Sequence, residues 1–194
     1  MSHASTPDLL TLHAIRLLGS ARIEAIAERF RLDPDEVTRL VGQFAERGWI
    51  TAQTSDGVTQ WSLTDAGRAA NEAQLTDELD AVGARADVQR LLGRFDLHRT
   101  SVEELCSAAE ADPSPYAQDA ARIQLSGFTC YVQETEKAIT PHLPRFDGYY
   151  RRFSGALFRA EDDPVWLAGD DVDSCRRIWR ELNEDLLATL NERE

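Results

Sequence analysis

The sequence predicts a mainly helical fold that is interrupted once by a short β-hairpin. A helical pattern comes first, because apolar residues recur at i, i+3, i+4 and i+7: Val37, Leu40, Val41 and Phe44. Two strand-like runs follow, at 49–53 and 58–63, and the polar connection 54–57 between them ends in Asp-Gly, a hairpin signal. Only helical patterns come after Leu63, so we expect no further strand.

The helix before the hairpin has a clear start and stop. Asp33 is placed to be the N-cap, Pro34 occupies the first helical position, and Glu36 can close a capping box on the Asp33 amide. Gly48 is expected to end the helix in the left-handed conformation.

Two more helices are expected before this one. The first spans 9–18 and ends at Gly19, and the second is short and capped by Ser20. The connection 31–33 is a tight turn of the kind that joins the helices of a helix-turn-helix. With the hairpin as the wing and a further helix capped by Thr64, residues 8–72 are predicted to form a winged helix-turn-helix domain.

Two segments of this domain resemble the MarR-like winged-helix group of transcriptional regulators. They are LDPDEVTRLVGQFAERGWI (32–50) and WSLTDAGR (61–68), and the likeness covers about the first 75 residues. The resemblance implies a DNA-binding regulator. Winged helices also serve as protein-binding modules, so the fold alone does not decide the function.

Residues 73–194 are predicted to be an all-helical domain, too large to be only a dimerisation arm. We expect helices over 65–95 (one helix, or two broken at Gly83 or Gly93), 101–111, 115–140, 146–158 and 174–191, the last capped by Asp173. The helix after the wing and the terminal helix each carry an apolar stripe. Helices in these positions commonly pair subunits in the resembled group, which predicts a homodimer unless one core absorbs both stripes.

The net charge of −13 opposes DNA binding, because DNA is bound chiefly by neutralising phosphates. The excess acid is uneven: residues 1–72 have a net charge of −3 and residues 73–194 a net charge of −10. The predicted wing, 51–60, contains no Arg or Lys. DNA and a protein therefore both stay open as the partner.

Six residues are the candidate DNA contacts. Four lie on the exposed face of the predicted recognition helix and two in the wing: Thr38, Arg39, Gln43, Arg47, Thr54 and Ser55. Arg39 could make a bidentate contact to guanine and Gln43 one to adenine, and Thr38 could reach a phosphate or a thymine methyl. Asp35 and Glu36 occupy the first turn, where they favour the helix dipole but would repel phosphates.

The alternative is a protein-interaction module that has lost DNA contacts. Residues 12–32, LHAIRLLGSARIEAIAERFRL, also resemble winged-helix appendages found with phosphoenolpyruvate-using dikinases. That resemblance implies an enzyme as the protein partner.

An Arg-aromatic helix is the one unusual feature of the second half. It carries the candidate ligand residues Tyr149, Tyr150, Arg151 and Arg152. The pattern fits a core face with a solvated arginine rim. It also fits a pocket in which Tyr hydroxyls and guanidinium groups meet a small anion.

Nothing in the sequence indicates catalysis, a metal or a cofactor. No His pairs with a second ligand at i+3 or i+4, the acidic cluster 170–173 lacks calcium-loop spacing, and nucleotide and nucleophile motifs are absent. Three cysteines, an odd number in no metal-binding spacing, predict reduced thiols and a cytoplasmic protein. No apolar run approaches the roughly 20 residues of a membrane span.

Overall fold

The computed structural model describes residues 5–170 and 172–192. The chain divides into two compact units: the first unit is Met1–Gly83 with Ala188–Glu194, and the second unit is Ala84–Leu187. The prediction of a mainly helical chain with one small antiparallel hairpin is confirmed, and no strand follows Leu63 in the described ranges.

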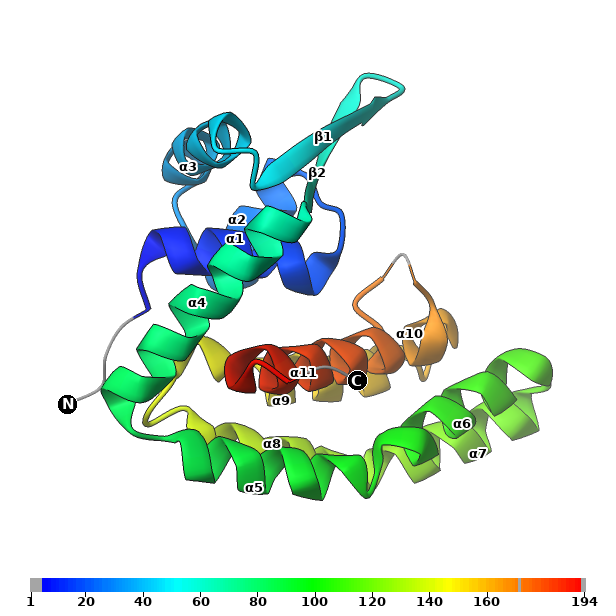
Figure 1. Ribbon diagram of the computed structural model, residues 1–194. Helices are drawn as coiled ribbons and strands as arrows, with labels where there is room; N and C mark the ends of the chain where they lie inside the picture. The colour runs from blue at the N-terminus through cyan, green and yellow to red at the C-terminus, as the bar shows by residue number, and fades with distance from the viewer. Residues whose placement is uncertain (1–4, 171, 193–194) are drawn as a thin grey trace. The chain divides into compact units, whose positions relative to one another are not determined.

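The first unit packs three helices and the base of a hairpin around one core (Figure 1). Its elements are α1 (Pro7–Leu18), α2 (Ile23–Phe30), α3 (Pro34–Glu46), β1 (Ile50–Ser55), β2 (Val58–Leu63) and α4 (Asp65–Val82). The largest fully buried side chains of that core are Leu12, Ile15, Ile26 and Phe44. The apolar stripe that the sequence placed on α3 supplies Phe44, so the helical period identified the buried face correctly.

The hairpin has the turn that Asp-Gly predicts. Asp56 and Gly57 have φ of 51° and 77°, and Ser55 pairs directly with Val58, which defines a two-residue type I′ loop. The connection is therefore shorter than expected, because Thr54 and Ser55 belong to β1.

The segment before α2 differs from the prediction. Ser20 does not cap α2, which begins at Ile23 after an extended Arg22. Instead, Ala21 forms an antiparallel bridge with Trp61 of β2, and Ser20 Oγ donates to Gln60 Oε1 over 3.1 Å. Pairing with a strand 40 residues away kept these residues extended and delayed the helix.

The expected domain boundary between residues 72 and 73 lies inside α4, which runs without a break to Val82. Gly83, with φ of 66°, ends α4 and marks the division between the two units. In the first unit, Leu75 of α4 packs with Leu9 and with Ala188, so the last residues of the chain belong to this unit.

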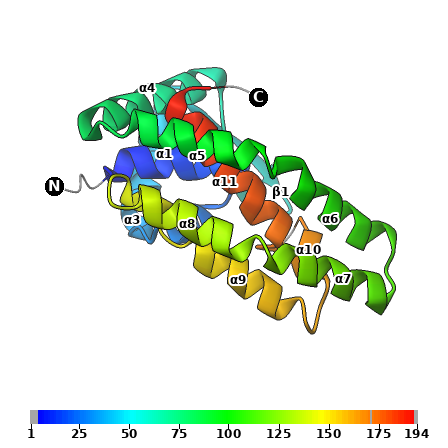
Figure 2. The same ribbon diagram turned by 90° about the horizontal axis from the view of Figure 1, so that it is seen from below.

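The second unit is helical throughout its described residues. Its elements are α5 (Arg85–Asp96), α6 (Arg99–Ala111), α7 (Pro115–Ser126), α8 (Thr129–Ile139), the 3₁₀ turn η1 (Pro144–Phe146), α9 (Tyr149–Arg159), α10 (Val165–Ala168) and most of α11 (Cys175–Leu190). The antiparallel pair α6 and α7 lies side by side in both views (Figures 1 and 2). Trp179 of α11 is 1% exposed and packs against rings from α5, α8 and α9, which makes α11 the central helix of this unit.

Four details of the second unit correct the sequence-based expectations. The helix expected over 115–140 is two helices, α7 and α8, which divide at Gly127 and Phe128, where the Phe128 ring turns onto Trp179 at 5.6 Å. Ser101 does not open α6, which begins two residues earlier. The aromatic helix starts at Tyr149, later than expected, after Gly148 with φ of 102°. Ser174, not Asp173, caps α11, because its Oγ accepts from the Arg177 amide over 3.2 Å.

Both apolar stripes that suggested a homodimer are buried within the single chain. Leu75 and Leu79 of α4 are 0% exposed. The stripe of α11 is at most 5% exposed: Ile178, Leu182, Leu186 and Leu190. The alternative in which the chain itself absorbs both stripes therefore accounts for them.

Candidate nucleic-acid interface and a buried ionic network

The ends of α3 are fixed by local hydrogen bonds. At the start, Asp33 Oδ1 accepts from the Asp35 amide over 2.8 Å, which confirms Asp33 as the N-cap. At the end, the Trp49 amide donates to the Phe44 carbonyl over 2.9 Å and the Gly48 amide to Ala45 over 3.0 Å. These are the two bonds of a Schellman motif, and the Phe44 and Trp49 rings, 5.6 Å apart, provide its usual apolar contact.

One face of α3 is buried and the opposite face is exposed. The stripe Val37, Leu40, Val41 and Phe44 is at most 5% exposed. The four helical candidates for DNA contact are all exposed: Thr38, Arg39, Gln43 and Arg47. A fixed helix with a free polar face can lie against a second macromolecule without rearranging its own core.

The exposed side chains differ in how free they are. Thr38 Oγ1 donates to the Pro34 carbonyl over 2.8 Å, so its hydroxyl proton is already used and its methyl group is the part that can contact a base. Arg39 lies 3.7 Å from Glu36, and both side chains are well exposed, so this ion pair can open at little cost. The Arg47 guanidinium lies 4.9 Å from the centre of the Trp49 ring, a cation–π contact that holds it near the end of α3.

The charge around α3 and the hairpin is negative. Residues 32–63 contain two arginines and five carboxylates, a net charge of −3. Asp35 is exposed on the first turn of α3, and the side chain of Glu36 beside it is 40% exposed. These two carboxylates lie where the contacts to phosphate would be made in a helix-turn-helix, so they weaken any such contact.

The hairpin candidates Thr54 and Ser55 are exposed, as are all residues of β1 after Ile50. Thr54 Oγ1 and Thr59 Oγ1 are 3.0 Å apart and share a hydrogen bond across the two strands. The sole charged residue of 50–63 is Asp56 in the turn. Thr54 and Ser55 can therefore offer hydroxyl groups but no positive charge.

A set of short-range hydrogen bonds connects the two ends of the hairpin at its base. The Thr64 amide donates to the Trp49 carbonyl over 2.9 Å, and Thr64 Oγ1 donates to the Gly48 carbonyl over 2.7 Å. The same Oγ1 accepts from the Gly67 amide over 3.1 Å, which confirms Thr64 as the N-cap of α4. A Cβ on Gly67 would lie 1.9 Å from the Trp49 carbonyl oxygen, so only glycine fits there.

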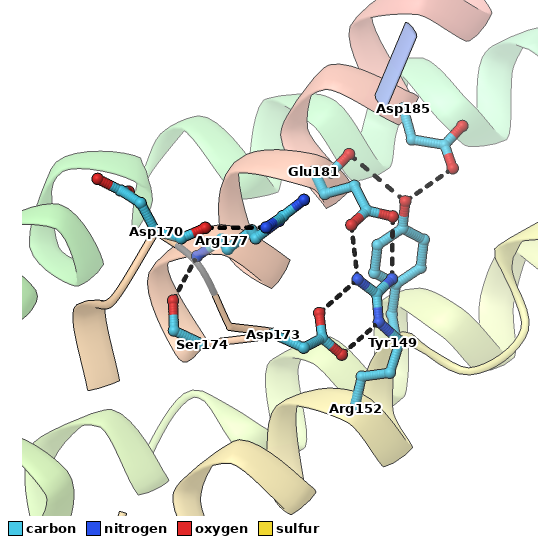
Figure 3. A network of polar contacts seen from close by, with 8 residues as sticks. All are labelled: Tyr149, Arg152, Asp170, Asp173, Ser174, Arg177, Glu181 and Asp185. Atoms are coloured by element: carbon cyan, nitrogen blue, oxygen red, sulfur yellow. Dashed lines mark hydrogen bonds and ion pairs between the residues drawn. The ribbon is translucent and has the colours of Figure 1, made fainter. Parts of the chain in front are cut away.

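The candidate ligand residues of α9 do not point to one place. Tyr149 is 1% exposed, and its hydroxyl donates to Asp185 Oδ2 over 2.9 Å (Figure 3). The side chain of Arg151 is exposed, whereas Tyr150 is half-buried and gives its backbone amide to Glu136 Oε2 over 2.7 Å. The structure therefore brings together only Tyr149 and Arg152 from the expected set.

Arg152 is enclosed by carboxylates. It donates to both oxygens of Asp173, over 2.9 and 2.7 Å, and to both oxygens of Glu181, over 2.9 and 2.6 Å (Figure 3). Burial lowers the pKa of Arg152, but the hydrogen bonds and charges of Asp173 and Glu181 outweigh it and raise the pKa above its usual range. Arg145 pairs with Asp185 beside them, and neither of these two side chains is exposed.

The carboxylates of this buried ionic network were not identified from the sequence. Glu181 and Asp185 are 3% and 0% exposed, yet acidic residues four apart on a helix are usually solvated. No local signal marks them, because their partners come from another helix. The interpretation of 145–159 as an aromatic core face with a solvated arginine rim holds for Tyr149, which is buried, and for Arg151, which is exposed. It fails for Arg145 and Arg152, which are drawn into ion pairs with carboxylates.

The remaining polar groups give no further site. The structure contains no cluster of three His, Cys, Asp or Glu side chains suited to a metal within the ranges it describes, and Asp171 of the acidic cluster lies outside them. Burial raises the pKa of the Cys106 thiol to about 12, and burial likewise raises that of Cys175. Neither thiol is a reactive nucleophile at neutral pH. None of the described helices has the length and apolar character needed to cross a membrane.

Comparisons with protein-family models, with curated proteins and with solved structures find no match for this chain.

Proposed function

We propose that α1–α4 and the hairpin form a winged helix-turn-helix and that the chain is a cytoplasmic DNA-binding transcriptional regulator. The main support for this proposal is the way α3 is held, with one face buried and the other exposed. Its apolar stripe is buried against α1 and α2, while its other face is exposed and bears Arg39, Gln43 and Arg47. A helix held in this way is the element that enters the major groove in such proteins. The cysteines are free thiols, in keeping with the cytoplasm.

Arg39 is the leading residue for base recognition in this proposal. It lies in the middle of the exposed face, and its partner Glu36 is 40% exposed, so water can replace that contact while the guanidinium turns to a guanine. Gln43, one turn later, is exposed and can reach an adenine. Thr38 can place its methyl group against a thymine.

The test is selection of a preferred sequence from random duplexes, followed by binding measurements on Arg39→Ala. We expect a loss of about 1–3 kcal/mol and relaxed preference at one base position. Arg90→Ala is the matched control, because Arg90 also forms an exposed pair at i,i+3, with Asp87 of α5. Recovery of no preferred sequence, together with equal DNA retention of Arg39→Ala and wild type, would contradict the proposal.

The salt dependence of binding gives a second test of the same interface. With only two arginines in residues 32–63, few phosphates can be neutralised from this surface. Each neutralised phosphate contributes about 0.9 to the slope of log affinity against log salt. Two neutralised phosphates give a slope of about 2, and a slope of about 8 would mean that DNA binds a different surface.

A protein-docking module is the second candidate function, and the net charge of −3 over residues 32–63 favours it. A basic protein surface would be attracted by Asp35, Glu36 and Glu46, which DNA phosphates would avoid. The partner of such a module could be an enzyme, as the resemblance of residues 12–32 suggests. Binding of a phosphoenolpyruvate-using dikinase by the wild type but not by Asp35→Lys would support it, and equal binding would oppose it.

The second unit is proposed as the effector half of the regulator. Of the two carboxylates on Arg152, Asp173 is the more accessible, with 38% of its side chain exposed against 2% for Glu181. A small anion could therefore take the place of Asp173 while Glu181 stays. The test adds inorganic phosphate to wild type and to Asp173→Ala: phosphate should raise the melting temperature of both, and by more in the variant, where no carboxylate has to be displaced. No rise in wild type would oppose an effector site here.

A further inference from the structure

The outer edge of β1 carries backbone groups that the hairpin does not use. Ala52 lies opposite Trp61, and the Trp61 amide and carbonyl both bond to Ala21 on the far side of β2, over 2.8 and 3.1 Å. The pair Ala52–Trp61 is therefore one of the non-hydrogen-bonded pairs of the ladder, and so is Thr54–Thr59 two residues on. The N–H and C=O groups of Ala52 and Thr54 thus point away from β2.

Nothing in the described part of the first unit protects this edge. Each residue from Thr51 to Ser55 is exposed, and the register runs from Ile50 to Ser55 without a bulge. The strand contains no charged residue and no proline, which are the usual devices against edge pairing. The opposite edge differs, because Ala21 and Ser20 cover it at Trp61 and Gln60.

The hairpin also lacks a packing partner beyond its base. Ile50 is 4% exposed, but the five residues after it in β1 are exposed on both faces. A two-stranded ribbon without an apolar face is marginally stable alone in water, and a third strand is a common source of extra stability.

We propose that the outer edge of β1 docks an extended, basic segment of a partner protein, which adds to the hairpin as a third strand. Main-chain hydrogen bonds to Ala52 and Thr54 provide the affinity, as in other strand-addition complexes. This surface is separate from the exposed face of α3, so the inference goes beyond the proposed function and holds whether or not α3 binds DNA.

The charge on the chain selects this occupant over a second copy. Two copies would bring together chains that each have a net charge of −13, whereas a basic segment meets the net −3 of residues 32–63 with attraction. The strand β1 contains no charged residue, so it does not itself favour a basic or an acidic partner. Specificity in the proposed complex therefore comes from carboxylates outside the strand, of which Asp56 in the turn directly follows it.

The experiment titrates the full chain with a synthetic peptide of alternating lysine and threonine, which places all lysines on one side of an added strand. A peptide of alternating glutamate and threonine is the charge control. Binding is measured by calorimetry, and amide hydrogen exchange reports on individual residues. We expect the basic peptide to bind and to slow exchange at Ala52 and Thr54, and the acidic peptide to do neither.

Proline substitutions on the two edges provide matched variants. Thr54→Pro removes an outward amide of β1, and Thr59→Pro removes an outward amide of β2. Both lose the same Thr54–Thr59 hydroxyl contact, so the loss of that contact is common to the two variants. We expect Thr54→Pro to weaken peptide binding about tenfold, since one hydrogen bond and the fit of the strand are lost, and Thr59→Pro to bind as wild type does.

Three outcomes would overturn the inference. Equal loss of binding in both proline variants would show that the peptide needs the hairpin but not the β1 edge. Protection of Ala52 and Thr54 by duplex DNA, without protection by the peptide, would assign the edge to nucleic acid. A wild-type dimer in sedimentation that becomes a monomer in Thr54→Pro, but stays a dimer in Thr59→Pro, would assign the β1 edge to a second copy of the chain.

Discussion

The exposed face of α3 and the buried network of α9 and α11 use the same chemical groups in opposite ways. On α3, Arg39 and Glu36 are 3.7 Å apart, and their side chains are 57% and 40% exposed. In the second unit, the side chains of Arg145 and Asp185 are in contact and neither is exposed. An exposed pair is worth little and its partners can be exchanged for others. A buried pair cannot be opened without a large cost, which makes it a structural element.

This comparison is tested most strongly by Asp185→Ala. The substitution removes the carboxylate that both Arg145 and the Tyr149 hydroxyl contact in the interior. We expect a loss of about 3–5 kcal/mol in the free energy of unfolding, measured by urea denaturation. The control Asp87→Ala breaks the exposed pair with Arg90 and should cost less than about 1 kcal/mol. Similar losses in both variants would mean that burial does not separate the two kinds of pair.

Gly67→Ala tests the corresponding constraint in the first unit. There, stability is expected to rest on a close backbone contact, whereas in the second unit it rests on a buried ion pair. A Cβ at Gly67 would meet the Trp49 carbonyl oxygen at 1.9 Å, so backbone must move. We expect a loss of about 3 kcal/mol in the free energy of unfolding. Gly42→Ala is the control, since a Cβ there meets nothing within 4 Å and α3 should gain about 1 kcal/mol of stability. An unchanged melting temperature in Gly67→Ala would contradict the close contact.

Arg31→Gly should have a smaller effect and of the opposite sign. Arg31 has φ of 55° and ends α2 in the left-handed conformation, where the Leu32 amide donates to Ala27 over 2.9 Å. Glycine adopts this conformation without steric cost, so we expect the free energy of unfolding to rise by about 1 kcal/mol, measured by thermal denaturation. Arg31→Ala keeps the steric cost and should give no gain. A gain in both variants would trace the effect to charge instead.

The smallest effect on stability is expected from the double variant Asp35→Asn with Glu36→Gln. Both side chains are accessible and interact mainly with the dipole of α3, so the free energy of unfolding should change by about 0.5–1 kcal/mol. If α3 binds DNA, the same variant should bind DNA more tightly, because two carboxylates no longer repel phosphates. Weaker DNA retention than wild type would show that these carboxylates make favourable contacts.

The sequence predicted what depends on near neighbours along the chain. The cap at Asp33, the stop at Gly48 and the Asp56-Gly57 turn all follow from bonds within a few residues. Part of the site was also predictable, since the buried stripe of α3 defines its exposed face by elimination.

The features that the sequence did not predict depend on residues far apart along the chain. The predicted cap at Ser20 made Ala21 a helix start, because its partner Trp61 is distant in sequence. Nothing near Gly67 in the sequence marks its close contact with the Trp49 carbonyl. Glu181 gave no signal in the sequence, because the period of α11 marks Leu182 and Leu186 as core but cannot mark a buried carboxylate whose partner lies on α9. Long-range pairing of this kind leaves no periodic signal in a single sequence.

The junction at Thr64 has a consequence for how the hairpin could change over evolution or in the laboratory. Both ends of the hairpin are tied at its base, through Trp49, Thr64 and Gly67, and none of those bonds involves the residues from Thr51 to Thr59. The length and charge of the tip can therefore be changed by mutation without removing the hydrogen bonds that attach the hairpin. Replacing the turn between Ser55 and Val58 by a longer one that contains arginine would give the hairpin positive charge for binding phosphates, while the rest of the first unit stays the same.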